Sequence, residues 1–155
     1  MEQTRLGRQT VALARAPVVT GSAGVAGKKE GEGPLAAQFH YVSQDDSFGE
    51  KSWEKAESTM QRMALSAALD QAGRTASELD YALAGDLLNQ CISSSFALRG
   101  QEVPFYGLYG ACSTMAQTLA MAGVFVESGA ARRPAPVTSS PFCSAERPFR
   151  LPLGF

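Results

Sequence analysis

The residues with the clearest chemistry in this chain surround Cys112. An aromatic run over residues 105–109 predicts a strand, and the small residues that follow Thr114 predict a helix. Gly110 and Ala111 predict a turn between them, which places Cys112 in the first turn of that helix. Unpaired N–H groups and the positive end of the helix dipole favour negative charge there, either on a thiolate or on a bound carboxylate. Cys112 is therefore predicted to centre either nucleophilic chemistry or anion binding.

The elements that must position Cys112 alternate between helix and strand. Hydrophobic periodicity and turn residues predict helices over residues 52–73, 89–98 and 114–128, and strands over residues 80–84, 105–109 and 137–140. This alternation predicts an α/β fold with a mainly parallel sheet. Ligands of such sheets lie beyond the C-terminal ends of the strands. The residues expected to converge there are Asp86, Cys112, Ser139 and Ser140.

The N-terminal third of the chain predicts short elements. Residues 10–13 and 18–23 are β-branched, apolar runs that predict two short strands or a hairpin. Residues 24–34 predict a loop, and its glycines lack the order of a phosphate-binding motif. In the helix that follows, Trp53 and Met60 recur at helical spacing, which predicts that they face the core.

Composition excludes several classes of function. Hydrophobic residues make up 45% of the chain and charged residues 19%, which is typical of a globular domain. A net charge of −1 gives no electrostatic basis for binding nucleic acid. The longest nearly apolar run, residues 119–126, is too short to cross a bilayer, and no secretory signal is predicted at the start. Membrane association is therefore expected to be peripheral and to depend on a partner.

The three cysteines predict reduced thiols. Cys91, Cys112 and Cys143 form an odd set without CxxC spacing, which argues against a disulfide framework. His40 is the one histidine and lies far from all three, so no zinc site is predicted. The acidic residues between 45 and 50 lack the order of a calcium-binding loop and predict a solvated face. We expect neither a metal nor a cofactor.

The helix predicted over residues 114–128 is apolar nearly all round. Ala116, Ala120 and Gly123 make it thin, while Met115 and Phe125 add apolar surface. A helix of this kind is normally buried on all sides. A chain of this length can cover this helix on one side only. We therefore expect a broad exposed apolar patch on its other side and a tendency of the chain to aggregate.

Several runs of residues are long enough to be specific. They are residues 31–35 (GEGPL), 48–58 (FGEKSWEKAES), 84–90 (AGDLLNQ), 92–96 (ISSSF), 107–115 (GLYGACSTM) and 144–147 (SAER). These runs resemble the stage V sporulation protein AD family, and the resemblance extends from Gly7 to Arg150. It implies a thiolase-like fold, related to ketoacyl synthases and built from two similar halves. Residues 1–155 are then expected to be the N-terminal half of the duplicated fold, truncated relative to the family, with a mainly parallel sheet and a central buried helix.

The resemblance further implies a non-enzymatic protein that binds dipicolinic acid (pyridine-2,6-dicarboxylate) for uptake during sporulation and release in germination. The implied partners are dipicolinic acid or its calcium salt, the other proteins of the SpoVA transport system and, in the full-length form, a second copy. The implied location is peripheral, on the cytoplasmic face of the forespore or spore inner membrane. The implied ligand-binding residues are Asp86, Cys112, Ser113, Ser139, Ser140 and Phe142. The pyridine ring is expected to pack on Phe142 or on Tyr109.

Two departures from the family pattern affect one side of the implied pocket. Pro141 stands where the family typically has a histidine, so a ring without a donor replaces an imidazole. Pro134 and Pro136 fall within a stretch that should form a central strand, where proline is poorly tolerated. Both departures predict a weakened pocket on this side.

The same residues support other interpretations. Cys112 could instead be acylated by a thioester substrate in a thiolase-like acyltransferase, or it could pack beneath the strand as a small residue. Asp86 is equally suited to capping the next helix, and Ser139 and Ser140 to an exposed loop. Arg147 could bind a carboxylate or brace the loop around it. A third function is that of a structural subunit that docks on membrane components without a ligand.

Overall fold

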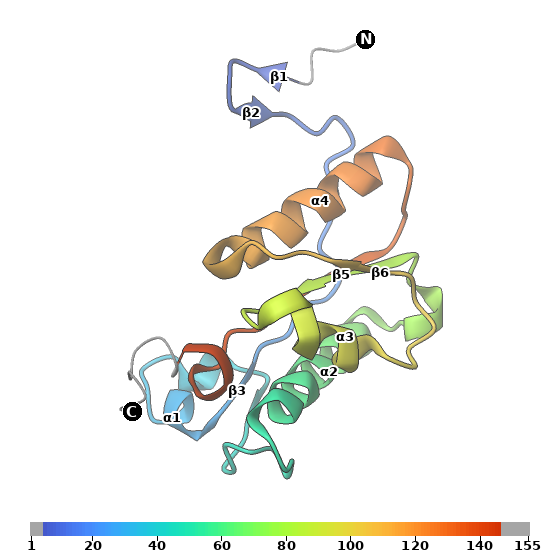
Figure 1. Ribbon diagram of the computed structural model, residues 1–155. Coiled ribbons are helices and arrows are strands. Elements are labelled where there is room, and N and C mark those ends of the chain that lie inside the picture. Colours follow the sequence, from blue (N-terminus) through green and yellow to red (C-terminus); the bar gives the residue numbers. More distant parts are fainter. Residues whose placement is uncertain (1–4, 147–155) are drawn as a thin grey trace.

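A three-stranded parallel sheet forms the centre of the chain, in a computed structural model that describes residues 5–146. Its strands are β5 (Tyr81–Gly85), β6 (Phe105–Gly107) and β7 (Pro134–Thr138), arranged in the order β6-β5-β7. Figure 1 shows the sheet edge-on between layers of helices. The predicted α/β fold with a parallel sheet is therefore confirmed.

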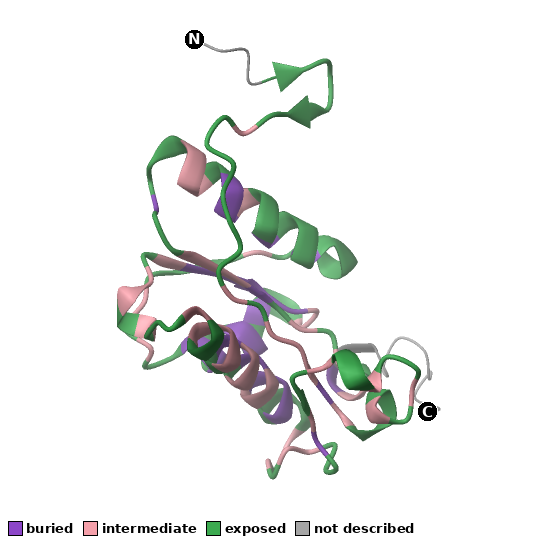
Figure 2. Cartoon of the chain, turned by 180° about the vertical axis from the view of Figure 1, so that it is seen from behind, coloured by how far each residue is buried: buried purple, intermediate pink, exposed green. Residues whose placement is uncertain are grey.

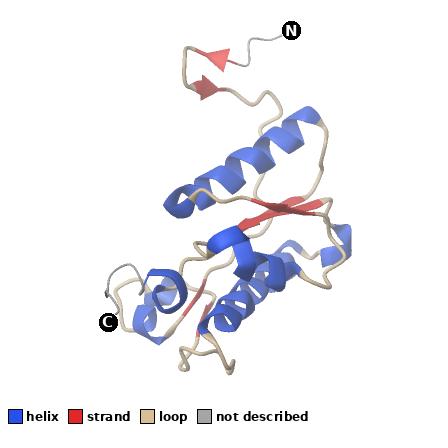
Figure 3. Cartoon of the chain, in the orientation of Figure 1, coloured by secondary structure: helices blue, strands red, loops and turns tan. Residues whose placement is uncertain are grey.

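Helices cover both faces of this sheet. Helix α4 (Thr114–Ser128) lies on one face, against β5 and β7. Helices α2 (Trp53–Ala72) and α3 (Ile92–Leu98) lie together on the other face, and Figure 3 shows the resulting three layers. The hydrophobic core lies between the sheet and the layer formed by α2 and α3, and its buried residues are Leu65, Ala82, Ala84, Leu98 and Val137. Small residues on β5 let helices approach the central strand from both sides.

Helix α2 begins and ends where the sequence predicts. The hydroxyl of Ser52 accepts a hydrogen bond from the backbone N–H of Lys55 at 3.3 Å, which caps the first turn. Gly73 ends the helix in the left-handed conformation, with φ of 62°. These two residues fix the length of the helix that carries the buried polar side chains described below.

The buried face of α2 differs from the predicted one. Trp53 is exposed and Met60 half-buried, so the prediction that this stripe forms the core is wrong in part. Glu57 and Gln61 are buried instead, on the same face as Leu65. The reason lies in tertiary contacts. Serines from α3 and from the segment after β7 form hydrogen bonds with these polar groups, which offsets the free-energy cost of burying them.

Short elements make up the N-terminal third. Strands β1 (Arg5–Leu6) and β2 (Thr10–Val11) form an antiparallel hairpin, and β3 (Val25–Ala26) pairs in parallel with β4 (Tyr41–Val42). Helix α1 spans Lys28–Gly31. The remaining short helical turns are η1 (Ala36–Gln38), η2 (Ala76–Glu78), η3 (Asn89–Cys91), η4 (Ala111–Ser113) and η5 (Phe142–Glu146).

Two predictions for this region are wrong. Residues 18–23 form no strand and pair with none of the described strands. The N–H of Ser22 donates to Gln71 of α2 at 2.6 Å. Residues 24–34, predicted as a loop, contain β3 and α1.

Strand β7 includes two prolines without losing its pairing. The N–H of Ser139 donates to the carbonyl oxygen of Gly85, and the register continues through Ala84 with Val137. Alternation along the strand therefore turns the nitrogens of Pro134 and Pro136 away from β5, toward the open edge. The prediction that these prolines interrupt the strand is wrong, since neither occupies a position that must donate to β5.

Helix α4 is covered on one side only. Thr114, Thr118, Ala122 and Gly123 are buried against the rest of the chain. The other face is exposed, as Figure 2 shows, and it includes Met115 at 60% and Leu119 at 47% exposure. The predicted apolar patch is confirmed, and within these residues the helix is not enclosed. Across the described ranges, no helix has both the length and the apolarity needed to span a bilayer.

Candidate functional site

Cys112 lies on a sharp turn between β6 and α4. Ala111, directly before it, has a positive φ of 48°, a conformation that costs a residue with a side chain free energy and that clusters at functional sites. Cys112 follows in the short turn η4 and is exposed. The predicted strand–turn–helix arrangement is confirmed, and the thiol stands beside the N-terminus of α4.

The turn is held by its own hydrogen bonds. The hydroxyl of Thr114 donates to the carbonyl oxygen of Ala111 at 2.8 Å and accepts from the N–H of Gly110 at 3.2 Å. The hydroxyl of Ser113 donates to the carbonyl oxygen of Gly110 at 2.6 Å. Ser113, a predicted ligand residue, therefore uses its donor to close the turn that presents Cys112.

The end of β5 packs directly against this turn. The N–H of Leu108 donates to the carbonyl oxygen of Ala84 at 2.9 Å. A Cβ atom on Gly85 would lie 1.9 Å from the carbonyl oxygen of Leu108 and 2.7 Å from the methyl group of Thr114. Glycine is required at this position because the backbone after β6 crosses the strand end too closely for any side chain.

Asp86, the next residue, is fully buried and acts as a cap. One carboxylate oxygen accepts from the N–H of Leu88 at 2.9 Å. The other accepts from both the N–H and the hydroxyl of Ser94, at 2.8 and 2.6 Å. Since Ser94 lies in the first turn of α3, the capping role predicted for Asp86 is confirmed. Its role in ligand binding stays a prediction.

Ser139 and Asp86 belong to one buried hydrogen-bonded group, which we call the serine–carboxylate cluster. Its members come from α2, α3, the ends of β5 and β7, and η5, and all of them are buried except the half-buried Ser139. They are Glu57, Gln61, Asp86, Ser93, Ser94, Ser139 and Ser144. The amide nitrogen of Gln61 donates to the hydroxyl oxygens of Ser94 and Ser139, at 3.0 and 2.6 Å. Gln61 thereby connects the residues that bind Asp86 with those that bind Glu57.

Glu57 is the second buried carboxylate of the cluster. Ser139 donates to one of its oxygens at 2.6 Å, and Ser144 and Ser93 donate to the other at 2.5 and 3.2 Å. Burial raises the pKa of Glu57, the nearby charge of Asp86 adds to the rise, and the serine hydrogen bonds oppose it. Within the described residues neither carboxylate has a cation as ion-pair partner.

Sequence reasoning missed Glu57 and Gln61. The signal available was their spacing, because Glu57, Gln61 and Leu65 repeat every fourth residue and so share one face of α2. Hydropathy pointed instead to the neighbouring stripe of the helix, which carries Met60 and Met63. Serines 93 and 94, whose hydroxyls satisfy the cluster, lie in a motif that the sequence did highlight.

The remaining predicted residues lie after β7. Ser140 and Phe142 are exposed, and Pro141 between them is half-buried. Arg147 lies outside the described residues. The structure thus joins Asp86 to Ser139 through Ser94 and Gln61, while Cys112 and Ser113 lie on the separate turn at the end of β6.

The cysteines are all free thiols. Cys91 is buried, and its Sγ donates to the carbonyl oxygen of Leu108 at 3.5 Å. Burial, with a further contribution from the charge of Asp86, raises the pKa of the Cys91 thiol. This thiol is therefore a weaker nucleophile than an ordinary cysteine at neutral pH. Among residues 5–146, no group of three or more potential metal ligands is found.

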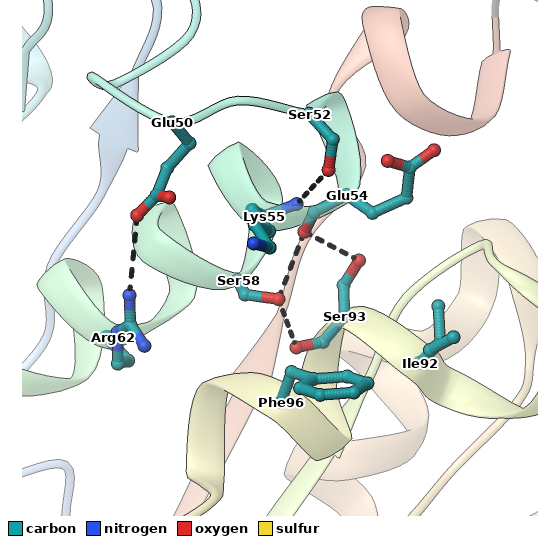
Figure 4. A pocket seen from close by; sticks show the side chains of 9 residues that line it. All are labelled: Glu50, Ser52, Glu54, Lys55, Ser58, Arg62, Ile92, Ser93 and Phe96. Carbon is teal, nitrogen blue, oxygen red and sulfur yellow. Dashed lines mark hydrogen bonds and ion pairs between the residues drawn. The ribbon is translucent and has the colours of Figure 1, made fainter.

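A cavity of about 410 Å³ lies elsewhere, between the start of α2 and α3. Its lining, shown in Figure 4, combines Ile92 and Phe96 with charged side chains that include Arg62 and Glu50, 3.9 Å apart. None of the six predicted ligand residues lines this cavity.

Together these features define an α/β chain with an exposed cysteine on a strand-to-helix turn and, separately, a buried polar cluster. The family model for stage V sporulation protein AD matches residues 7–155, and the chain belongs to this family. The stage V sporulation protein AD of Bacillus subtilis (strain 168) is 40% identical over 140 residues, which are 90% of this chain and 41% of the relative. The chain thus spans less than half the length of this curated relative.

Two solved structures are similar to part of the chain. One is 3-oxoacyl-[acyl-carrier-protein] synthase III from Aquifex aeolicus VF5, with a TM-score of 0.46 and 22% identity, covering 55% of this chain and 30% of that one. The other is the priming β-ketosynthase of the R1128 polyketide biosynthetic pathway, with a TM-score of 0.44 and 23% identity, covering 59% and 27%.

Proposed function

We propose that this chain is part of a non-enzymatic protein that binds dipicolinic acid for the SpoVA transport system of the spore. Membership of the stage V sporulation protein AD family supports a role in sporulation. The observation that carries the ligand proposal is the exposed Cys112, held at the N-terminus of α4 by a turn with a strained residue. An N-terminus of this kind attracts carboxylates.

The proposed contacts follow from the geometry of the turn. The thiol of Cys112 and the backbone N–H groups that begin α4 would meet a carboxylate of the ligand. The aromatic ring would pack against Phe142 or Tyr109, which are both exposed. Because Ser113 donates to Gly110 and Ser139 donates to Glu57, their hydroxyls would shape the site more than bind the ligand.

The wider role is proposed on the same basis. The protein would act in dipicolinate uptake and in its release at germination, with the free acid or its calcium salt as ligand. It would reach the inner spore membrane through other SpoVA proteins, and the full-length form would pair with a second copy. The exposed apolar face of α4 supports an association of this chain with further protein.

Calorimetric titration with dipicolinate tests the proposal. This chain would be joined to the remaining part of the Bacillus subtilis relative, and Cys112→Ala compared with the control Ser128→Ala, at an exposed residue that ends α4. We expect Cys112→Ala to weaken binding by about tenfold, the equivalent of one good polar contact, and the control to bind normally. The 155-residue chain alone should bind far more weakly. Absence of any heat with the joined protein, folded by circular dichroism, would exclude dipicolinate binding.

An acyltransferase is the second candidate, because the exposed thiol on a strained turn is also suited to nucleophilic attack. The Cys112 thiolate would attack the thioester carbonyl of an acyl-CoA, and the new thioester would form as the CoA thiolate leaves. Intact mass spectrometry after incubation with acetyl-CoA would reveal an acetyl adduct that Cys112→Ala lacks. We expect no adduct. If the joined protein instead docks on the membrane components of the SpoVA system, and this docking survives mutation of Cys112 and Ser139 but not of surface residues, a docking subunit becomes the better description.

A further inference from the structure

Glu57 contacts both ends of the segment that follows β7. Ser139 opens this segment and Ser144 lies near its end, and each donates its hydroxyl to a different oxygen of the same carboxylate. The residues between them include Ser140 and Phe142, which are predicted to meet the ligand. One buried side chain on α2 therefore fixes both ends of a segment whose middle is exposed.

The direction of these hydrogen bonds explains why a carboxylate is needed. Ser94 donates its proton to Asp86 and Ser139 donates its proton to Glu57, so both hydroxyls can only accept from the amide of Gln61. Glu57 must accept from Ser139 on one oxygen and from Ser93 and Ser144 on the other. A carboxylate has two accepting oxygens, whereas a side-chain amide has one.

Resting on the proposed function, we propose that Glu57 is a positioning residue for the ligand site: its two oxygens hold Ser139 and Ser144 against α2 and so set the orientation of Ser140 and Phe142. Glu57 itself does not touch the ligand, because it is fully buried. The two carboxylates of the cluster thus have different roles: Asp86 caps α3, and Glu57 anchors the segment after β7.

Hydrogen exchange measured by mass spectrometry on the 155-residue chain gives the first test. Glu57→Gln leaves one accepting oxygen, so amide exchange in residues 139–144 should rise by about tenfold, the effect of one lost hydrogen bond to a buried carboxylate. Exchange in α4 should stay unchanged. The matched control is Glu54→Gln, an exposed glutamate one turn earlier on the same helix. Unchanged exchange in residues 139–144 would overturn the proposal. Should Glu57→Gln fail to fold, Ser144→Ala removes one of the two hydrogen bonds by which Glu57 holds the segment and decides the question.

Dipicolinate affinity gives the second test, in the chain joined to the rest of the Bacillus subtilis relative. Glu57→Gln and Ser144→Ala should each raise the dissociation constant by about tenfold, and the double variant by about the same factor, because both remove one interaction. A hundredfold loss in the double variant, or full affinity in both single variants, would contradict positioning. If the unaltered joined protein binds no dipicolinate, the proposed function fails, while the exchange experiment still decides whether Glu57 anchors the segment.

Discussion

Among the described residues, the buried carboxylates of Glu57 and Asp86 have no cation as ion-pair partner, and both burial and the charge of Asp86 affect how Glu57 titrates. The folded state holds a proton on Glu57 more tightly than the unfolded chain does, because burial and the charge of Asp86 raise its pKa above the ordinary value of 4.5. A raised pKa in the folded state means that the contribution to stability is complete below 4.5 and is lost as the pH rises through the folded value.

The contribution of Glu57 to stability should therefore fall as the pH rises above 4.5, and Glu57→Gln should remove this part of the pH dependence. Urea unfolding of both proteins at a series of pH values between about 4 and 8 measures the effect as a change in slope. The exposed control Glu54→Gln should keep the slope of the unaltered chain. An identical slope in Glu57→Gln would show that another group causes the pH dependence.

At the scale of elements, the crossing of β5 and the turn after β6 constrains the site most. Gly85→Ala would bring a methyl group to 1.9 Å from the carbonyl oxygen of Leu108, so the turn that presents Cys112 would have to move. We expect a loss of about 1–3 kcal/mol in the free energy of unfolding, as for other overpacked sites. Gly107→Ala on β6 is the matched control, because its nearest contact would be an ordinary 3.5 Å.

Chemical denaturation of both variants provides the measurement. Dipicolinate titration of the joined protein should also show weaker binding for Gly85→Ala than for Gly107→Ala. Equal stability of the two variants would mean that the chain after β6 can shift freely, which would contradict a tightly built turn.

Local signals predicted the elements best where the chain itself supplies the ends. Ser52 and Gly73 fix α2, and the helix over residues 114–128 matches its prediction. The sequence could not predict which face of α2 is buried, because that depends on serines distant in the chain. It likewise placed Asp86 and Ser139 at the same sheet edge without revealing that Gln61 connects them. The sequence also could not show that a strand runs through Pro134 and Pro136, because this depends on which side of β7 pairs with β5.

At the scale of the molecule, the exposed face of α4 predicts self-association. Met115 and Leu119 present large apolar side chains on a helix whose other side packs against the sheet. Sedimentation velocity of the 155-residue chain should show a sedimentation coefficient that increases with concentration. Leu119→Lys should reduce this increase, because a charge in the centre of the patch opposes its burial.

Leu35→Lys serves as the control, since Leu35 is also an exposed leucine but lies in the N-terminal third of the chain, outside α4. It should leave the self-association unchanged. A monomer at all concentrations would show that the face of α4 is not sufficiently adhesive to drive association. If Leu119→Lys and Leu35→Lys reduced self-association equally, the association would depend on exposed apolar residues in general and not on the face of α4.

The two prolines of β7 have a consequence for any strand that joins the sheet beside it. Their ring nitrogens face the open edge, where each would otherwise offer a hydrogen to an incoming backbone. A strand added on that side could donate hydrogen bonds to the carbonyl oxygens of β7 but would find no N–H donor at the two prolines. Its attachment must therefore rely on side-chain packing. The opposite margin, along Phe105–Gly107, contains no proline and keeps its full set of donors for a neighbour.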